Sequence, residues 1–202
     1  MLNWIANHQG PLSVMINAGM LAIWVLYAQL LLRDYRRKLR PKILINQSLG
    51  TALQSHCLIC NMSEQSFYIS LVIAELTTED TTYHCSVTDL EVQEANTTKN
   101  VTIQGPLKGA DYRDIGAFNN IVQGTLKENS LDETVLQQAR QLTLYIIGIY
   151  GSENQAVGAR RKFCFGTDEQ GNSCLNPVHI DTDNLTGRRH QKEIRHWLED
   201  YL

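Results

Sequence analysis

The sequence lacks the short motifs that identify common enzyme classes. It has no Gly-x-Ser-x-Gly nucleophile elbow, no glycine-rich phosphate loop and no His-Glu-x-x-His zinc motif. The first ten residues contain no Lys or Arg, and residues 11–32 contain no charged side chain. Paired acids such as Glu79-Asp80 lie in turn-like stretches, where such charges are usually solvated. We therefore expect no catalytic site and no cofactor.

One long apolar run is the strongest positive feature of the chain. It extends from Pro11 to Leu32 and covers 22 residues. At about 1.5 Å per residue, a helix of this length crosses the ~30 Å hydrocarbon core of a bilayer. A cleaved signal peptide carries its positive charges before the apolar stretch, and a core helix of a soluble protein is rarely apolar on all faces. The run therefore predicts a single transmembrane helix over residues 11–32.

A basic collar follows the apolar run over residues 33–42. Short flanks rich in Lys and Arg stay on the cytoplasmic side of a membrane, which places the 1–10 tail outside the cell and the 43–202 domain in the cytoplasm. The same residues suit anionic lipid headgroups, although a topology signal alone would explain them. The collar consists of Arg33, Arg36, Arg37, Lys38, Arg40 and Lys42.

The charge changes sign after the collar. Up to Lys42 there are six Lys or Arg and one Asp, whereas the rest of the chain has twelve Lys or Arg and twenty Asp or Glu. Binding to nucleic acid phosphates needs clustered Lys and Arg. An acidic domain on a basic stem therefore excludes nucleic acid as a partner.

Small and polar residues share one face of the expected membrane helix. Small residues let two helix backbones approach closely, and an amide in hydrocarbon gains from a partner across an interface. We favour helix pairing over a lone span that tolerates two amides. The expected pairing face consists of Asn17, Ala18, Ala22, Val25 and Gln29.

The five cysteines do not form a disulfide pattern. An odd number without a tight framework agrees with a reducing compartment. Several Cys and His could supply a four-ligand zinc site, but residues 57 and 60 of one strand point to opposite faces. We interpret these cysteines as buried core residues. The candidate ligands are His56, Cys57, Cys60, His84 and Cys85.

Asparagines in Asn-x-Ser/Thr sequons occur five times after the collar. They would be glycan acceptors only in an exported domain. Because the charge rule places the domain in the cytoplasm, we interpret them as ordinary turn and strand-end residues. They are Asn46, Asn61, Asn96, Asn100 and Asn184.

Residues 43–202 have the pattern of an antiparallel β-sandwich. Apolar and alternating segments recur every 8 to 12 residues with turn-like stretches between them. The clearest pair is 141–150 with 156–165, joined by a five-residue turn. The other expected strands are 42–46, 55–62, 67–77, 81–90 and 99–104.

Two segments change to helical spacing. Residues 111–128 place Ile115, Phe118 and Leu126 on one face, and Asp111 or Asp114 would cap the helix. Residues 184–201 place Ile194, Trp197, Leu198 and Tyr201 on one stripe, with Arg188, Arg189, Lys192 and Arg195 opposite. We expect both helices to pack on the sheet as accessory elements of an immunoglobulin-like sandwich.

The order of these features resembles a group of bacterial single-pass membrane proteins with no assigned activity. The resemblance rests on the segment 40–46, on Tyr150-Gly151 with 157–163, and on the ending 188–198. It implies a bacterial inner membrane. A weaker resemblance to inward-rectifier potassium channels concerns shape alone, since this chain has no second span and no Thr-Val-Gly-Tyr-Gly filter.

We expect a membrane-anchored accessory or scaffold protein that binds a protein partner, or a second copy of itself, at the cytoplasmic face. A metal or redox sensor using the His/Cys residues, or an enzyme without a recognisable motif, are the alternatives. The basic run Arg160, Arg161 and Lys162 suggests an exposed edge or a solvated strand end, and whether it is a binding surface stays open.

Overall fold

The computed structural model describes residues 9–38, 40–48, 53–88, 91–94, 97–100, 102–151, 156–167, 171 and 173–201. The chain divides into two compact units, 1–40 and 41–202. Three parts of the expected elements lie outside the described residues: positions 1–8 of the tail, Asn96, and positions 152–155 of the 151–155 turn.

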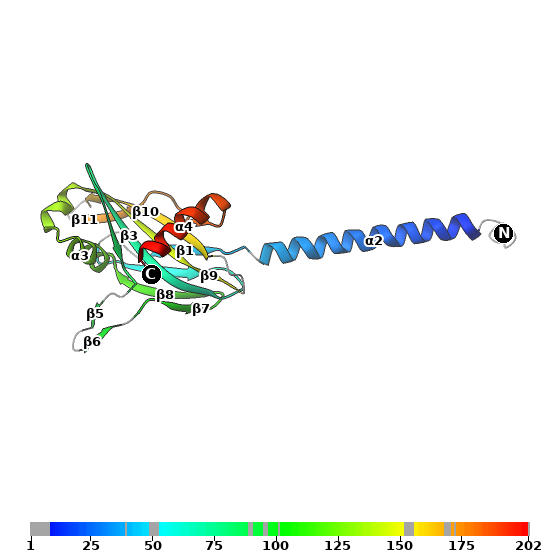
Figure 1. Ribbon diagram of the computed structural model, residues 1–202, viewed down its shortest axis with the longest axis horizontal. Helices are drawn as coiled ribbons and strands as arrows, with labels where there is room; N and C mark the ends of the chain where they lie inside the picture. The colour runs from blue at the N-terminus through cyan, green and yellow to red at the C-terminus, as the bar shows by residue number, and fades with distance from the viewer. Residues whose placement is uncertain are drawn as a thin grey trace. The chain divides into compact units, whose positions relative to one another are not determined.

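The N-terminal unit contains one long helix, α2 (Gln9–Lys38) (Figure 1). Its segment Ser13–Arg36 is long and apolar enough to span a membrane. Every described side chain of that segment is exposed. The predicted apolar helix is confirmed, and it continues through most of the basic collar.

The second unit is mainly antiparallel β-structure. Its smaller sheet has the order β1-β2-β8. These strands are β1 (Ile43–Gln47), β2 (His56–Asn61) and β8 (Asp111–Ala117).

The larger sheet has the order β11-β10-β9-β3-β4, with β12 also paired to β10 and β7 to β3. A separate hairpin joins β5 (Glu91–Glu94) and β6 (Thr97–Asn100). The strands of the larger sheet are β3 (Phe67–Thr78), β4 (Thr82–Ser86), β7 (Gly105–Leu107), β9 (Ala139–Tyr150), β10 (Ala156–Thr167), β11 (Ser173–Pro177) and β12 (Asp183–Leu185).

The two sheets face each other across the main core, as in a β-sandwich. Alternate residues of β1 and β2 pack against alternate residues of β3 and β9, because side chains alternate between the faces of a strand. The core between the sheets includes Ile43, Ile45, Cys57, Ile59, Phe67, Ile69, Val72, Leu142, Leu144, Ile146 and Phe163.

Strand β3 is buried on both faces. Its register with β9 shifts between Ile69 and Leu71, which moves Val72 and Ala74 onto the face already occupied by Phe67 and Ile69. Leu71 and Ile73 point the other way, into a second apolar cluster. The expectation of a central strand over 67–77 is therefore confirmed.

Helix α3 (Phe118–Glu128) completes the main core. Phe118, Ile121 and Val122 are buried there, and the Phe118 and Phe163 rings pack edge to face with centroids 4.9 Å apart. The helix ends at Asn129, as its sequence indicates. A short 3₁₀ helix, η1 (Glu133–Gln138), then leads into β9.

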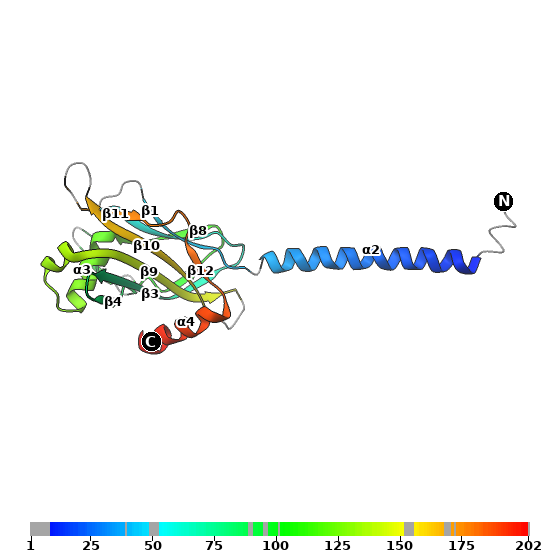
Figure 2. The same cartoon turned by 90° about the horizontal axis from the view of Figure 1, so that it is seen from above.

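Helix α4 (Arg188–Tyr201) covers the opposite face of the large sheet. Figure 2 shows α4 on one side of β3 and β9 and the strands β1 and β8 on the other. Ile194 is buried against Leu71, Ile73, Tyr145, Ile147 and Leu185, and Trp197, Leu198 and Tyr201 pack beside it. The expected stripe of α4 therefore does face the sheet.

Several expected boundaries are wrong. Residues 111–117 form strand β8, and α3 begins after Ala117 without a side-chain cap, so neither Asp111 nor Asp114 caps it. Residues 102–104 are not a strand, and 183–185 form β12 before α4 starts at Arg188. Strands β7 and β11 have no counterpart among the expected elements.

Candidate functional site

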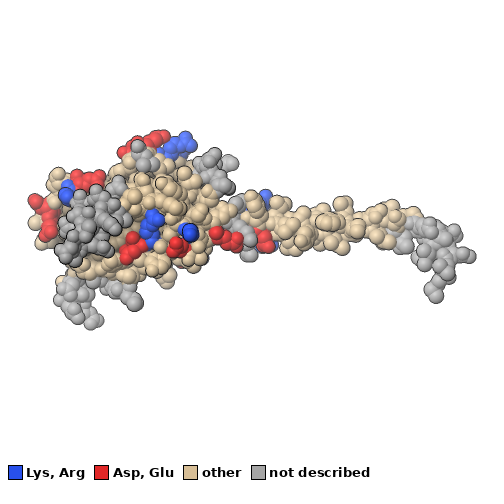
Figure 3. Space-filling view, turned by 90° about the horizontal axis from the view of Figure 1, so that it is seen from below, with Lys and Arg blue, Asp and Glu red and all other residues tan. Residues whose placement is uncertain are grey.

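The membrane-spanning candidate α2 exposes its predicted pairing face. Asn17, Ala18, Ala22, Val25 and Gln29 are all exposed. In Figure 3 most of the helix is tan, the colour of uncharged residues, and its charged side chains lie near its C-terminal end. Pairing through this face remains a prediction. The collar residues Arg33, Arg36, Arg40 and Lys42 are exposed, and the side chains of Arg37 and Lys38 lie outside the described ones.

The His and Cys candidates lie in two different sheets. Cys57 is fully buried between the sheets, whereas Cys60 is half-buried on the outer face of β2, as the strand geometry predicts. Cys85 is buried on β4, in the other sheet. Among the described residues, no group of three or more His, Cys, Asp or Glu could hold a metal ion.

Each His candidate has a carboxylate partner. His56 Nδ1 lies 2.7 Å from Asp114 Oδ2 at the surface, and His84 Nε2 lies 3.3 Å from Glu75 Oε2. Burial raises the pKa of the Cys57 and Cys85 thiols, that of Cys85 to about 12 with a contribution from Glu128. Thiols with raised pKa values are poor nucleophiles and poor metal ligands at neutral pH. This arrangement gives no support to a redox or metal role.

The basic run on β10 is not at an exposed edge. Strand β10 pairs with β9 on one side and with β11 and β12 on the other. Arg160 forms an ion pair with Asp183 at 3.3 Å, and Lys162 accepts a backbone hydrogen bond from Val178 at 2.9 Å. The run is therefore inside the sheet, and the expectation of an edge or a solvated strand end is wrong.

Arg161 connects the two sheets. Its guanidinium donates to the carbonyl oxygens of Ile45 and Ile180 and lies 5.6 Å from the centre of the Phe163 ring. Burial lowers the pKa of Arg161, but a guanidinium stays charged. Its guanidinium thus links the Ile45 carbonyl of β1 to the Ile180 carbonyl in the segment that precedes β12.

The same edge of β1 is closed by two further side chains. The backbone N–H of Ile43 donates to Asn184 Oδ1 (2.8 Å), and that of Ile45 donates to Thr182 Oγ1 (3.0 Å). An unpaired strand edge invites association with another chain, so these contacts protect it. Sequence reasoning missed them because Asn184 and Ile43 are 141 positions apart.

Two of the sequon asparagines are hydrogen-bonded inside the fold. Asn61 is fully buried, and its Nδ2 donates to the carbonyls of Gln65 (2.8 Å) and Leu107 (3.1 Å). Asn184 Nδ2 donates to the Thr182 carbonyl (3.2 Å). A glycan on either nitrogen would replace these bonds, which agrees with the interpretation of both as structural residues.

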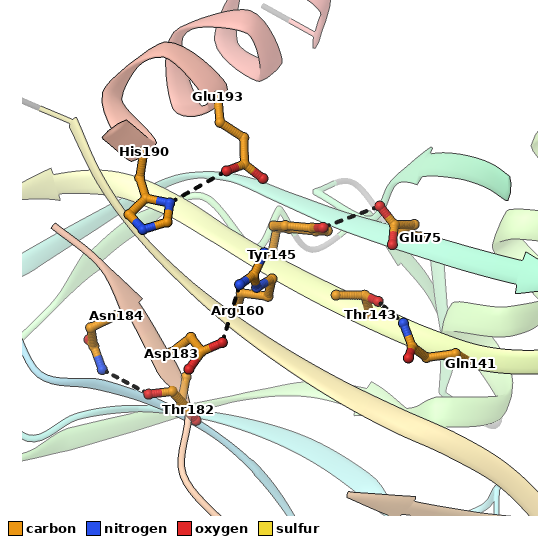
Figure 4. A network of polar contacts seen from close by, with 10 residues as sticks. All are labelled: Glu75, Gln141, Thr143, Tyr145, Arg160, Thr182, Asp183, Asn184, His190 and Glu193. Atoms are coloured by element: carbon orange, nitrogen blue, oxygen red, sulfur yellow. Dashed lines mark hydrogen bonds and ion pairs between the residues drawn. The ribbon is translucent and has the colours of Figure 1, made fainter. Parts of the chain in front are cut away.

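A polar network lies beneath α4, on the outer face of the large sheet (Figure 4). Tyr145 Oη donates to Glu75 Oε2 at 3.2 Å, and the same oxygen faces His84. Burial raises the pKa of Tyr145 to about 12, and the neighbouring Glu75 charge adds to the shift. Tyr145, Glu75 and His84 come from the adjacent strands β9, β3 and β4.

Trp197 of α4 covers this network. Its ring centroid lies 4.9 Å from that of His84 and 5.7 Å from that of Tyr145. A phenol whose pKa lies well above neutrality does not act as a base near pH 7. The polar contacts of this network join β9, β3 and β4 to one another, and the aromatic contacts of Trp197 pack α4 over them.

Comparisons with protein families, curated proteins and solved structures find no match to this chain.

Proposed function

We propose that this protein is a membrane-anchored accessory or scaffold protein that binds a protein partner at the cytoplasmic face of a bacterial inner membrane. The observation that carries the proposal is the exposed apolar surface of α2. Its apolar side chains, including Leu21, Trp24 and Leu30, are exposed around the helix and meet no protein core. A bilayer is the environment that would bury them.

The orientation is proposed from charge. The collar residues follow the apolar segment, and short basic flanks remain in the cytoplasm. The domain would then carry its free thiols in a reducing compartment, in agreement with the absence of disulfides among the described cysteines. We also propose an immunoglobulin-like architecture, with α3 and α4 as accessory helices.

The positions of the polar residues favour binding over catalysis. The described His and Cys candidates are divided between two sheets, and the partly buried network of Tyr145, Glu75 and His84 is covered by Trp197. We propose that the partner, or a second copy, is held in part by the membrane face of Ala18, Ala22 and Val25, because small residues allow close helix packing.

A complex-size experiment tests this proposal. The full chain is expressed in a bacterial membrane, extracted in a mild detergent and separated by native electrophoresis. We expect a defined species larger than the single 22.9 kDa chain in its detergent micelle. The double variant Ala18→Leu/Ala22→Leu should lose that species, since larger side chains separate the helices.

Ser13→Leu is the matched control, because it makes the same kind of enlargement about 140° around the helix from Ala18. It should leave the larger species intact. A wild-type chain that migrates as a monomer, or two variants with equal effects, would contradict the proposed binding through this face.

A further inference from the structure

Exposed apolar side chains gather at one end of the β domain. Among its described residues, six large apolar side chains are exposed, and four of them lie at the end where β1 begins. These four are Met62 (57 % exposed), Tyr68 (46 %), Tyr112 (64 %) and Ile149 (42 %), and we call them the apolar rim.

Strand register places the rim residues close to the start of β1. The backbone N–H of Met62 donates to the Lys42 carbonyl (2.9 Å), and Tyr112 pairs with Cys60 on the neighbouring strand. Tyr68 pairs with Ile149 in the large sheet. The buried Asn61 joins the two sheets at this end, because it pairs with Ile43 and donates to the Leu107 carbonyl of β7.

The rim occupies both outer faces of the domain. Tyr112 pairs with Cys60, so both side chains lie on the outer face of the small sheet, whereas Ile59 points to the buried face. Tyr68 and Ile149 lie on the outer face of the large sheet, where Tyr68 is also paired with Pro106. Side chains on both faces therefore surround the same end, as expected of an end that meets a surface.

Positive charges accompany the rim. Lys42 and Lys108 are exposed at this end, and so is Arg189 in the first turn of α4. That turn is held here by the hydrogen bond from Gln191 Nε2 to the Ala156 carbonyl (2.9 Å), and Ala156 pairs with Ile149. Exposed acids also lie here, among them Glu64, Asp111 and Asp183, and the Asp183 carboxylate pairs with Arg160. The combination of basic and aromatic residues is complementary to an anionic lipid surface.

The length of the chain keeps this end near the membrane. Only four residues separate Lys38, the last of α2, from Ile43, the first of β1. Even fully extended, this connection spans at most ~18 Å. A surface tethered so closely has a high effective concentration at the lipid headgroups, so weak individual contacts are sufficient.

We propose that the apolar rim and its basic neighbours rest on the headgroup region of an anionic membrane and so fix the orientation of the domain. This inference rests on the membrane anchor of the proposed function. Tyr places an apolar ring and a polar hydroxyl across such an interface, and Met adapts to irregular apolar surroundings. The rim is a lipid contact, which leaves the remaining domain surface for the protein partner.

Site-specific photo-crosslinking tests the proposal with the full chain. The photoreactive residue p-benzoylphenylalanine replaces Tyr68 or Tyr112, and the purified protein is placed in nanodiscs of equal parts phosphatidylcholine and phosphatidylglycerol. Thr82 is the control position, since it is exposed at the far end of β3, where it pairs with Thr77. We expect lipid adducts at Tyr68 and Tyr112 and none at Thr82.

Charge is tested in the same nanodiscs. Lys42→Gln combined with Lys108→Gln should lower the adduct yield at Tyr112 severalfold, and nanodiscs of phosphatidylcholine alone should have the same effect. An unchanged yield in both would overturn the anionic preference. Adducts at Thr82 equal to those at the tyrosines, or none at either tyrosine, would overturn the lipid contact.

An alkaline carbonate wash distinguishes a rim that does not contact lipid from a helix α2 that does not span the membrane. If the chain stays in the membrane but its rim yields no lipid adducts, the inference fails while the anchor stands. If the chain is washed off, the anchor itself fails. A protein adduct at Tyr112 in intact cells without any lipid adduct would assign the rim to the partner and overturn the proposal.

Discussion

The contact between Tyr145 and Glu75 makes a pH-dependent contribution to stability. The unfolded phenol ionises near pH 10, whereas burial beside Glu75 raises the pKa of Tyr145 to about 12 in the folded protein. Above pH 10 the unfolded state binds fewer protons than the folded state, so the free energy of unfolding falls as the pH rises from 10 to 12. Below pH 10 the contribution is fully present.

Tyr145→Phe should therefore cost stability at neutral pH and progressively less at alkaline pH. We expect a loss of about 1 kcal/mol at pH 7, the typical net value of one hydrogen bond. The difference from the wild type should shrink above pH 10 and change sign before pH 12, because the pH-dependent loss of stability in the wild type over this range exceeds about 1 kcal/mol. Urea unfolding of both proteins in one detergent across this range measures it, and a difference independent of pH would contradict the assigned pKa.

The two cysteines of β2 should contribute unequally to the free energy of unfolding. Cys57 is fully buried between the sheets, so Cys57→Ala should lower the free energy of unfolding by about 1 to 2 kcal/mol. Cys60 is half-buried, and Cys60→Ala should cost no more than about 0.5 kcal/mol. Urea unfolding gives both values.

The metal content should be the same in the wild type and in the variant lacking both thiols. Elemental analysis of the purified protein measures it. Stoichiometric zinc in the wild type that disappears with Cys57 and Cys60 would contradict the structural interpretation and favour the sensor.

At the scale of elements, α4 is held to the large sheet by a short apolar stripe. Ile194 is buried and packs over Gly158, where a Cβ would lie 3.6 Å from Ile194 Cδ1. A Cβ at Gly158 would be in ordinary van der Waals contact with Ile194, and its tightest neighbour would be the Ile146 carbonyl oxygen of β9 at 3.2 Å. Trp197 then extends the contact toward Tyr145 and His84.

Truncation of the stripe should destabilise the domain in proportion to burial. Ile194→Ala should cost about 2 to 5 kcal/mol, the range for a buried aliphatic side chain. Trp197→Ala should cost less than the ~3 to 5 kcal/mol of a fully buried ring, because its side chain is only partly buried. Urea unfolding monitored by circular dichroism provides the values.

Arg195→Ala is the control for this series. Arg195 is exposed on the same helix, so its removal should change stability by no more than about 0.5 kcal/mol. If Ile194→Ala left stability unchanged and abolished an interaction instead, α4 would be a recognition element and not part of the fold.

At the scale of the whole molecule, topology follows from where the basic residues lie. A reporter fused after Leu202 should be active as a cytoplasmic marker and inactive as an exported one, because six Lys or Arg follow the apolar segment and none precedes it. Paired enzymatic reporters in a bacterial host make the measurement.

A charge-swap variant provides the control for topology. Replacing Arg33, Arg36, Arg37 and Lys38 by Gln and adding Lys residues before Pro11 should reverse the reporter signals. Export of the wild-type fusion would overturn the orientation. The exposed Asn46 would then be a candidate glycan acceptor in a host that has an N-glycosylating enzyme.

The sequence by itself determined the features that depend on neighbouring residues. The apolar run gave α2, the two-residue alternation gave β3, β9 and β10, and the helical stripe of Ile194 and Trp197 identified the buried face of α4. The opposite orientation of Cys57 and Cys60 followed from the same alternation. Local geometry decides these features, so they can be inferred without the fold.

Only the tertiary structure decided which distant groups meet. Strand β8 over 111–117 has helical spacing in its sequence, yet pairing with β2 makes it a strand, since nonlocal hydrogen bonds outweigh a weak local preference. The short β7, β11 and β12 exist because neighbouring strands supply partners. Likewise, Arg161 and Asn184 close the edge of β1, and the apolar rim forms, only because the fold brings together residues far apart in the chain.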